Sequence, residues 1–286
     1  MIGISLADSE TQAVELSFDG IIPTVHAIAE WKGGCRDAPA AIVQRIMAFA
    51  KANTARARKV AVTIDTGAMF AQVLPVPTGQ ANSLFHKHAA WDLAEFHPDL
   101  TPDAFITDVH LLHAATREGP PRVLSVSVRR DFVRGLQKEL HDHGFALHVL
   151  DGDQFSVEHF LVTRHPEGKL ARVVLLGAKR GRLDVSVLLD GQLVDYASWH
   201  EGTLEACGAK LAECVAVHGP VHAVFLYGPR ATQELVDGLR AAGYPACEAL
   251  NPFAGMDIAP GNPLATHFLA MPHRFVSAVG AALRED

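Results

Sequence analysis

A three-strand pattern occurs twice in the sequence, and it constrains the fold more than any other feature. In residues 171–199 an apolar run, a Gly and Lys/Arg turn, an alternating run and an Asp-Gly turn predict three consecutive antiparallel strands. Residues 1–31 follow the same order, with Asp19-Gly20 in the place of Asp190-Gly191. Any two antiparallel meanders share part of this pattern, but two half-chains that begin alike favour an internally duplicated fold.

Aligning Gly20 with Gly191 turns the duplication into a specific prediction. The two halves should form two mixed sheets with helices on their faces, and the core residues of the two meanders should superpose. The residues concerned are Ile2, Ile4, Val14 and Leu16 in the first half and Val173, Leu175, Val185 and Val187 in the second.

Length, hydropathy and charge exclude several classes of protein. The chain of 286 residues is long enough for two domains, each with its own core. No apolar run reaches the roughly 18 residues of a membrane span, and the start lacks the basic segment of a signal peptide, so we expect a cytoplasmic protein. A net charge of -7 argues against nucleic acid as the main partner, since that binding needs a basic surface.

The segments between and after the meanders predict alternating helices and strands, which indicate an α/β protein. Helices are predicted at about 37–53, 79–96, 130–143, 154–162, 200–217, 231–242 and 274–284. Strands are predicted at about 59–76 (two strands around Thr66-Gly67), 105–113, 122–128, 146–150, 222–227 and 245–250. The turn His165-Pro166-Glu167-Gly168 is the candidate domain boundary.

Five short segments occur in a characteristic order and spacing along nearly the whole chain. They are IGISLADSETQAVEL (2–16), RRDFVRGLQKELHDHGFALHVLD (129–151), SVLLDGQLV (186–194), LNPFAGM (250–256) and AVGAALR (278–284). Together with the order of elements, they resemble the PilM-like type IV pilus assembly proteins of the actin-like ATPase superfamily.

The resemblance implies a duplicated actin-like (ribonuclease H-like) α/β fold. The first domain would span residues 1–165, with a small inserted subdomain at about 78–150. The second would span 166–286, and its C-terminal helix 274–284 would pack back on the first domain. Because the helix 200–217 leads directly to the next strand, the second domain has no room for a large outer subdomain.

The nucleotide-binding positions that the resemblance identifies are degenerate. In actin-like ATPases, glycine amides of the meander turns hold the phosphates, and a carboxylate orients the hydrated magnesium ion. The corresponding positions here are Ser5, Ala7 and Gln12 in the first meander, Gly177 and Lys179 in the second, and Gly228 in the shortened loop Gly228-Pro229-Arg230. Two metal-facing carboxylates are thus missing. We predict a pseudo-ATPase without a cofactor, with ATP and magnesium as the alternative.

Some nearby residues could restore a site. Asp8 and Glu10 could replace the lost carboxylate, although acidic residues are also common at solvated hairpin tips. Basic residues of the second turn could hold an anion without metal or could simply keep the turn soluble; they are Lys179, Arg180 and Arg182. No metal site is predicted, because the histidine pairs 86/88 and 141/143 would point to different helix faces.

The resemblance also implies a function. It indicates a non-catalytic cytoplasmic scaffold of a type IV pilus-like assembly machine, which binds the short cytoplasmic tail of a single-span inner-membrane protein and links it to a cytoplasmic motor ATPase. The protein would reach the membrane only through this partner. Two alternatives stay open: a PilM-like protein that binds or slowly hydrolyses ATP, and the cytoplasmic part of a type II secretion platform protein.

The tail is expected in a groove between the main sheet of the first domain and the inserted subdomain. An extended tail can add hydrogen bonds at a sheet edge, and the negative charge of the protein favours a basic tail. The candidate contacts are Phe70, Phe85, Trp91, Asp92 and Glu95. The alternative is that Trp91, with Phe85 and Phe96, belongs to the core of the inserted subdomain.

Overall fold

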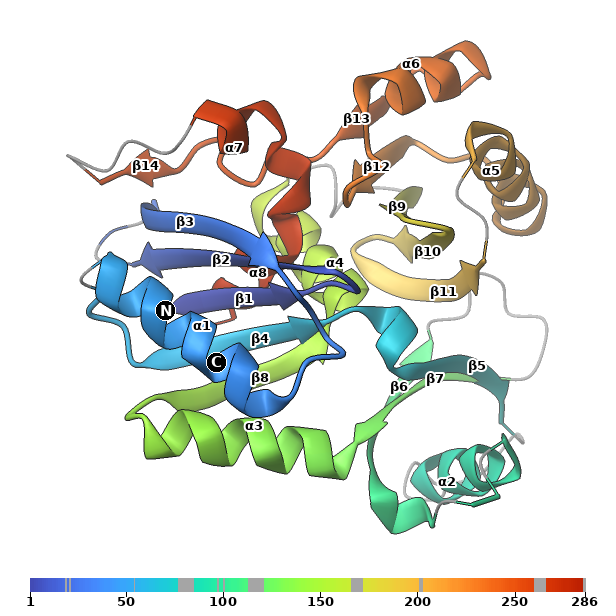
Figure 1. Ribbon diagram of the computed structural model, residues 1–286. Helices are drawn as coiled ribbons and strands as arrows, with labels where there is room; N and C mark the ends of the chain where they lie inside the picture. The colour runs from blue at the N-terminus through green and yellow to red at the C-terminus, as the bar shows by residue number, and fades with distance from the viewer. Residues whose placement is uncertain are drawn as a thin grey trace.

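The residues that the structure describes form three β-sheets with helices on their faces (Figure 1). The structure is a computed structural model, and it describes residues 1–286 except 19, 21, 54, 77–84, 97, 100, 113–120, 166–171, 201–202, 260–265 and 285–286. The strand orders are β14-β3-β2-β1-β4-β8, β11-β10-β9-β12-β13 and β5-β7-β6.

The first two sheets repeat one topology, which confirms the predicted duplication. In each, a meander of three antiparallel strands is followed by a strand parallel to its first member. The first sheet comprises β1 (Ile2–Leu6), β2 (Glu10–Ser17), β3 (Thr24–Lys32), β4 (Lys59–Ile64), β8 (Ala146–Gly152) and β14 (Asp257–Ile258). The second comprises β9 (Arg172–Lys179), β10 (Arg182–Leu189), β11 (Gln192–Trp199), β12 (Ala223–Tyr227) and β13 (Cys247–Ala249).

The predicted superposition of core residues was wrong by one position. Ile2 and Ile4 contribute to the core beside α1 and α3, whereas Val173 and Leu175 contribute to the core between the two sheets. The β-bulges give the correct alignment, since they fall after Glu15 in β2 and after Val187 in β10, 172 residues apart. Because side chains alternate along a strand, the predicted offset of 171 placed them on the wrong faces.

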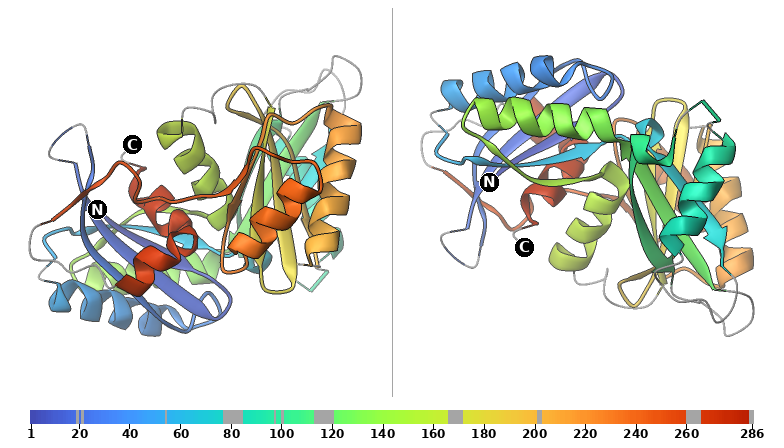
Figure 2. Two further views of the ribbon diagram at one scale, coloured as in Figure 1. Left: turned by 90° about the horizontal axis from the view of Figure 1, so that it is seen from above. Right: turned by 90° about the horizontal axis from the view of Figure 1, so that it is seen from below.

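Helices cover both outer faces and fill the space between the two large sheets. α1 (Pro39–Ala52) and α3 (Arg130–Asp142) cover the first sheet, and α5 (Leu204–His218) and α6 (Gln233–Ala241) cover the second (Figures 1 and 2). Thr203 and Thr232 cap α5 and α6, which explains why these helices begin later than predicted. α4 (Asp153–Arg164) and α8 (Val276–Ala282) lie between the sheets in the central core.

The third sheet forms the small subdomain inserted in the first half. It consists of β5 (Phe70–Pro75), β6 (Phe105–Leu112) and β7 (Arg122–Arg129), and α2 (Phe85–Phe96) packs on one face. The predicted range 78–150 differs from this, because β5 precedes it. Within the range, β8 belongs to the first sheet and α3 packs on that sheet. Residue 78, the start of the predicted helix 79–96 and most of the predicted boundary turn lie outside the described residues.

The last helix packs closely because its face is built of small residues. A Cβ at Gly3 of β1 would overlap the carbonyl of Ala278, and one at Gly280 would overlap the carbonyl of Ser156 in α4. α8 therefore contacts the first sheet on one side and α4 on the other. No described helix is long and apolar enough to cross a membrane.

This packing makes Gly280 the sensitive position of α8. We expect Gly280→Ala to lower the free energy of unfolding by about 1–3 kcal/mol, because the added methyl group must push α8 away from backbone atoms of α4. Urea denaturation at neutral pH measures the change. The control is Gly208→Ala in α5, where the added methyl group meets no atom and should stabilise the protein by about 0.5–1 kcal/mol. Equal effects of both changes would contradict the packing argument.

Candidate functional site

A cavity of about 270 Å³ lies where the carboxyl ends of β1 and β4 face those of β9 and β12. We call it the central cleft. Most of the predicted nucleotide positions line it, namely Ser5, Ala7, Asp8, Gln12, Lys179 and Gly228. The fold therefore brings these residues together as the resemblance implied. Gly177 lies behind the wall of the cleft, next to Gln154 and Tyr227.

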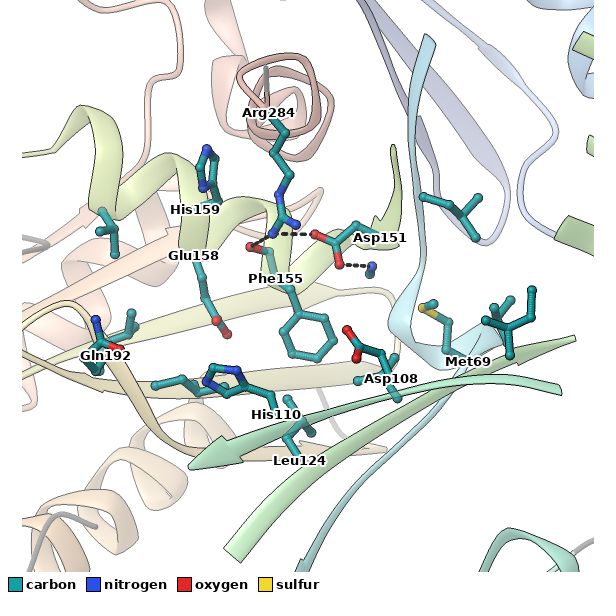
Figure 3. A pocket seen from close by; sticks show the side chains of 18 of the residues that line it. Met69, Asp108, His110, Leu124, Asp151, Phe155, Glu158, His159, Gln192 and Arg284 are labelled. Carbon is teal, nitrogen blue, oxygen red and sulfur yellow. Dashed lines mark hydrogen bonds and ion pairs between the residues drawn. The ribbon is translucent and has the colours of Figure 1, made fainter. Parts of the chain in front are cut away.

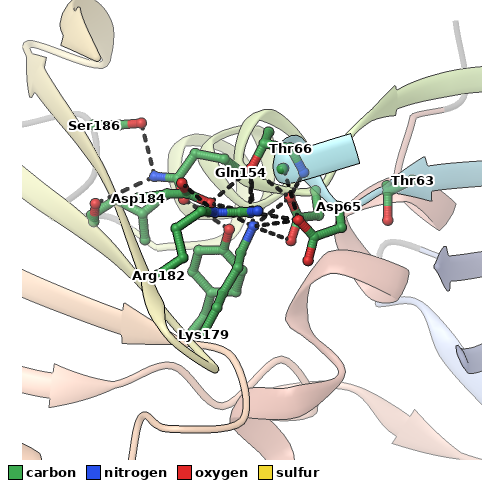
Figure 4. Close-up of polar contacts among 12 residues, drawn as sticks. Thr63, Asp65, Thr66, Gln154, Lys179, Arg182, Asp184 and Ser186 are labelled. Carbon is green, nitrogen blue, oxygen red and sulfur yellow. Dashed lines mark hydrogen bonds and ion pairs between the residues drawn. The ribbon is translucent and has the colours of Figure 1, made fainter. Parts of the chain in front are cut away.

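A buried cluster of charged side chains joins the two halves at one wall of this cleft (Figure 4). The ammonium nitrogen of Lys179 lies 2.7 Å from Asp153 Oδ2 and 2.5 Å from Asp184 Oδ2. It also donates a hydrogen bond of 3.0 Å to Thr66 Oγ1. Arg182 Nη2 lies 2.5 Å from Asp65 Oδ1 and 2.8 Å from Asp184 Oδ2. The Lys179 side chain is 8% exposed and that of Asp184 is 0% exposed, so these contacts are shielded from water.

The cluster contains three carboxyl groups and two cations. Burial alone would lower the pKa of Lys179, but Asp153, Asp184 and Asp65 raise it, so the ammonium stays charged. Burial would likewise raise the pKa of Asp184, yet Lys179 and Arg182 hold it below its ordinary value. Burial raises the pKa of Asp153, and this fits a cluster with one carboxyl group more than its cations can balance.

Other side chains fill the space next to Gly177, the position at which the resemblance implies a carboxylate in actin-like ATPases. A Cβ on Gly177 would lie 2.7 Å from Gln154 Oε1 and 2.8 Å from Tyr227 Oη. These two groups bind each other, because Tyr227 Oη donates a hydrogen bond of 2.7 Å to Gln154 Oε1. Position 177 therefore has no space for an aspartate in this structure.

The backbone N–H groups of the turn after β12 form hydrogen bonds within the chain. The Gly228 N–H donates to the carbonyl of His273 at 3.0 Å, and the Arg230 N–H donates to that of Ala178 at 3.0 Å. Pro229 has no N–H to offer. None of these three residues thus presents a free backbone donor to a phosphate or an adenosine.

The acidic residues of the first turn are engaged by arginines. Asp8 forms an exposed ion pair of 2.8 Å with Arg36. Glu10 binds Arg180 at 2.7 Å and Arg274 at 2.5 Å. Gln12 Nε2 donates a hydrogen bond of 3.0 Å to Glu30 Oε1. The basic residues of the second turn, considered above as an anion site, thus bind carboxylates of the chain itself.

Sequence reasoning missed the three aspartates that hold Lys179 and Arg182. Asp65 and Asp153 directly follow the parallel strands β4 and β8, and carboxyl ends of parallel strands meet at one sheet edge. An acidic residue directly after each of two parallel strands is therefore a sequence signal for this part of the cluster. Asp184 lies within β10 between buried neighbours, where an acidic residue needs a cation. Within the described part of the chain, no group of three or more His, Cys, Asp or Glu residues could hold a metal ion.

A second cavity of about 530 Å³ opens between the third sheet, α4 and the turn between β10 and β11 (Figure 3). We call it the groove. β6 borders it and is an edge strand of its sheet. The apolar walls include Ile106, Leu124, Val126, Val128, Val133, Val162, Leu188 and Leu193. The ionisable lining residues are Asp108, His110, Asp151, Glu158, His159 and Arg284.

Two carboxyl groups on the α4 side of the groove have raised pKa values. Burial raises the pKa of Asp151, although its ion pair of 2.7 Å with Arg284 acts in the opposite direction. Burial also raises the pKa of Glu158, to about 8, against a hydrogen bond from Ser186 Oγ. A carboxyl group with such a pKa is largely protonated at neutral pH.

The five predicted partner contacts lie away from the groove. Phe85 is buried between α2 and the third sheet, and Asp92 accepts a hydrogen bond of 2.6 Å from Gln72. Phe70 packs edge-on against Phe105 at 5.3 Å between ring centroids. Trp91 is 59% exposed, and Glu95 is exposed as well. α2 covers the face of the third sheet opposite the groove, so these residues lie on a different surface.

The comparisons with known proteins identify the fold. No protein-family model matches the sequence, and no curated protein is significantly similar to it. Among solved structures, the PilM-PilN type IV pilus biogenesis complex is similar with a TM-score of 0.77 and 18% identity, over 99% of this chain and 97% of that one.

Two further structures have the same fold with a lower TM-score. The cytoplasmic domain of EpsL, an inner-membrane component of the type II secretion system of Vibrio cholerae, has a TM-score of 0.55 and 13% identity, over 100% of this chain and 95% of that one. A Bacteroides thetaiotaomicron protein with an actin-like ATPase fold has a TM-score of 0.55 and 11% identity, over 90% of this chain and 92% of that one. The predicted actin-like fold is thereby confirmed.

The charged cluster leads to a prediction about stability. We expect Lys179→Met to lower the free energy of unfolding by roughly 3 kcal/mol or more, because it leaves three buried carboxyl groups with one cation. Urea denaturation at pH 7 measures the change. The matched control is Arg180→Met, whose exposed ion pair with Glu10 should contribute less than about 1 kcal/mol. A Lys179→Met variant as stable as the control would show that the cluster does not depend on its ammonium.

Proposed function

We propose that this protein is a non-catalytic cytoplasmic scaffold of a type IV pilus-like assembly machine, and that its groove holds the cytoplasmic tail of a single-span inner-membrane protein. The observation that carries the proposal is the contrast between the two cavities. Ion pairs within the chain occupy one wall of the central cleft, whereas apolar side chains form most of the lining of the larger groove and its ionisable residues lie among them.

The contacts in the central cleft support a protein without ATPase activity. A magnesium nucleotide needs backbone donors for its phosphates and a carboxylate for the metal. Here the Gly228 amide is used within the chain, Gly177 has no room for a carboxylate, and the Lys179 ammonium lies among the carboxyl groups of the cleft. The PilM-like alternative that binds or slowly hydrolyses ATP would have to break several of these contacts first.

The shape of the groove supports an extended polypeptide as its occupant. β6 has a partner strand, β7, on one side, and Ile106, Asp108 and His110 of β6 line the groove. A strand added at this edge would gain main-chain hydrogen bonds while apolar pockets accept alternate side chains. A tail bound in this way would attach the protein to the inner membrane without a membrane span of its own.

The solved structures support the machine that we propose. The most similar of the three described above is a complex of PilM with PilN, and the second belongs to an inner-membrane component of a type II secretion system. The higher TM-score of 0.77 favours a pilus-like machine over the secretion platform, for which the score is 0.55. A cytoplasmic motor ATPase is the further partner that we propose for this scaffold.

The absence of nucleotide binding is directly testable. We expect millimolar ATP with magnesium to leave the melting temperature unchanged. A ligand at a hundredfold excess over its dissociation constant would stabilise the protein by about 2.7 kcal/mol, which raises the melting temperature by several degrees. Thermal unfolding with and without nucleotide measures this. An ATP-specific rise that disappears in Asp8→Ala would establish a metal-facing role for Asp8 and overturn the pseudo-ATPase.

The location of the tail site can be tested with two exposed apolar residues of the inserted subdomain. Ile106 lines the groove and is 38% exposed, whereas Trp91 on α2 is 59% exposed on the opposite side of the sheet. We expect Ile106→Glu to weaken tail binding at least about tenfold, since it puts a charge against an apolar contact. Trp91→Glu should leave binding unchanged. Fluorescence anisotropy with labelled tails of the pilus or secretion proteins encoded beside this one measures both.

The opposite result would place the tail on α2. Binding that is lost in Trp91→Glu and retained in Ile106→Glu would favour the surface formed by Trp91, Asp92 and Glu95. Binding by neither the wild type nor the variants, with tails from both kinds of machine, would refute the scaffold as proposed.

A further inference from the structure

We infer that Glu158 selects the segment that the groove binds, by taking a lysine or arginine side chain of that segment at the α4 side of the groove. The inference rests on the proposed function of the groove and adds the chemistry of its occupant. The segment would carry one basic residue flanked by apolar residues.

Glu158 ends a chain of hydrogen bonds that runs from the central cleft to the groove. Tyr227 Oη donates to Gln154 Oε1 at 2.7 Å, and Gln154 Nε2 donates to Ser186 Oγ at 2.8 Å. Ser186 Oγ in turn donates to Glu158 Oε1. All three donors are directed the same way, so each bond polarises the next, and Glu158 is the final acceptor. This arrangement stabilises the carboxylate form of Glu158 once it ionises, although burial keeps the group largely protonated while no cation is near.

The carboxylate form of Glu158 has no direct ion pair among the described residues, and Arg284 only partly offsets the rise in its pKa. Arg284 is the guanidinium that lines the groove, and it binds Asp151 at 2.7 Å and the carbonyl of Phe155 at 3.4 Å. The other ionisable groups that face the groove are His159 of α4 and Asp108 and His110 of β6 (Figure 3). Three carboxyl groups and one arginine therefore line it. Asp108 is exposed to water, and Glu158 is the partly buried carboxyl group for which the described residues provide no direct ion pair.

A partly buried carboxyl group without a counter-ion is costly to ionise, and burial raises the pKa of Glu158 to about 8. An incoming ammonium or guanidinium group would lower this pKa and release the proton. A neutral side chain in the same place would leave the carboxyl group protonated and would gain no ion pair. The difference in binding free energy between the two favours a basic segment.

The remaining lining accounts for the apolar neighbours of the basic residue. Leu124, Val126 and Leu193 come from the third sheet and β11, and Val162 comes from α4. They surround the polar group with surfaces suited to aliphatic side chains. An extended chain places alternate side chains on opposite sides, so a basic residue can meet Glu158 while other side chains of the segment contact these walls.

The first test uses calorimetry with the tail peptides described above. We expect Glu158→Gln, which keeps the shape and the bond from Ser186, to weaken binding about tenfold or more. The matched control Asp108→Asn removes an exposed carboxyl group of the same groove and should change binding less than about threefold. Replacing the basic residue of the peptide by norleucine should cost as much as Glu158→Gln, and the two changes together should cost no more than either alone.

The pH dependence separates Glu158 from the histidines. As pH rises from 6 to 8, ionisation of Glu158 should strengthen binding, and the affinity should level off above its pKa. Near pH 7 the wild type should release about one proton more than Glu158→Gln on binding, as measured in buffers of different ionisation enthalpy. His110 and His159 remain in both proteins, so their contribution cancels in this difference.

A second experiment tests the inference without knowledge of the natural partner. A phage-displayed library of linear peptides is selected on the wild type and on Glu158→Gln, with Ile106→Glu as the groove-blocked control. We expect the wild type alone to enrich sequences with one lysine or arginine between apolar residues. Enriched sequences that depend on Ile106 but lack a basic residue would overturn the inference and leave the proposed groove intact. No enrichment, together with no tail binding, would overturn both.

Discussion

The ion pairs of Lys179 fix how the two halves of this protein meet. Lys179 and Asp184 come from the second meander, Thr66 follows β4 of the first half, and Asp153 begins the helix between the sheets. Removing charged groups from water is costly unless every one finds a partner, so these residues are satisfied only in one relative position of the halves. The same contacts fill one wall of the central cleft with paired charges of the chain itself.

α4 links the two cavities, because its first turn borders the central cleft and its second turn borders the groove. Asp153 lines the central cleft, Gln154 lies behind it, and Glu158 one turn later lines the groove. Residues four apart lie on the same side of a helix, so Gln154 and Glu158 both reach Ser186 on β10. The polar chain is therefore a consequence of packing α4 against the second sheet, and it directs its donors towards the proposed partner site.

The central core depends on small residues as much as on large ones. α8 fits between the first sheet and α4 because Gly3, Ala278 and Gly280 allow backbones to approach closely. Phe160 of α4, Phe253 and Phe275 at the start of α8 complete this core. The helix therefore ties the C-terminal end of the chain to β1, and the position of α4 follows from it.

The resemblance of its short segments implied the actin-like fold, and the sequence by itself determined the duplicated meanders and most of the elements. These features are local, since strand alternation, turns and residue identity can be read from neighbouring residues. Only the tertiary structure decided the offset between the halves, because a one-residue slip exchanges the two faces of a strand. It also decided which surface α2 covers and which carboxyl groups surround Lys179. Asp65, Asp153 and Asp184 are far apart in the chain, so their convergence depends on how sheets and helices pack rather than on any local pattern.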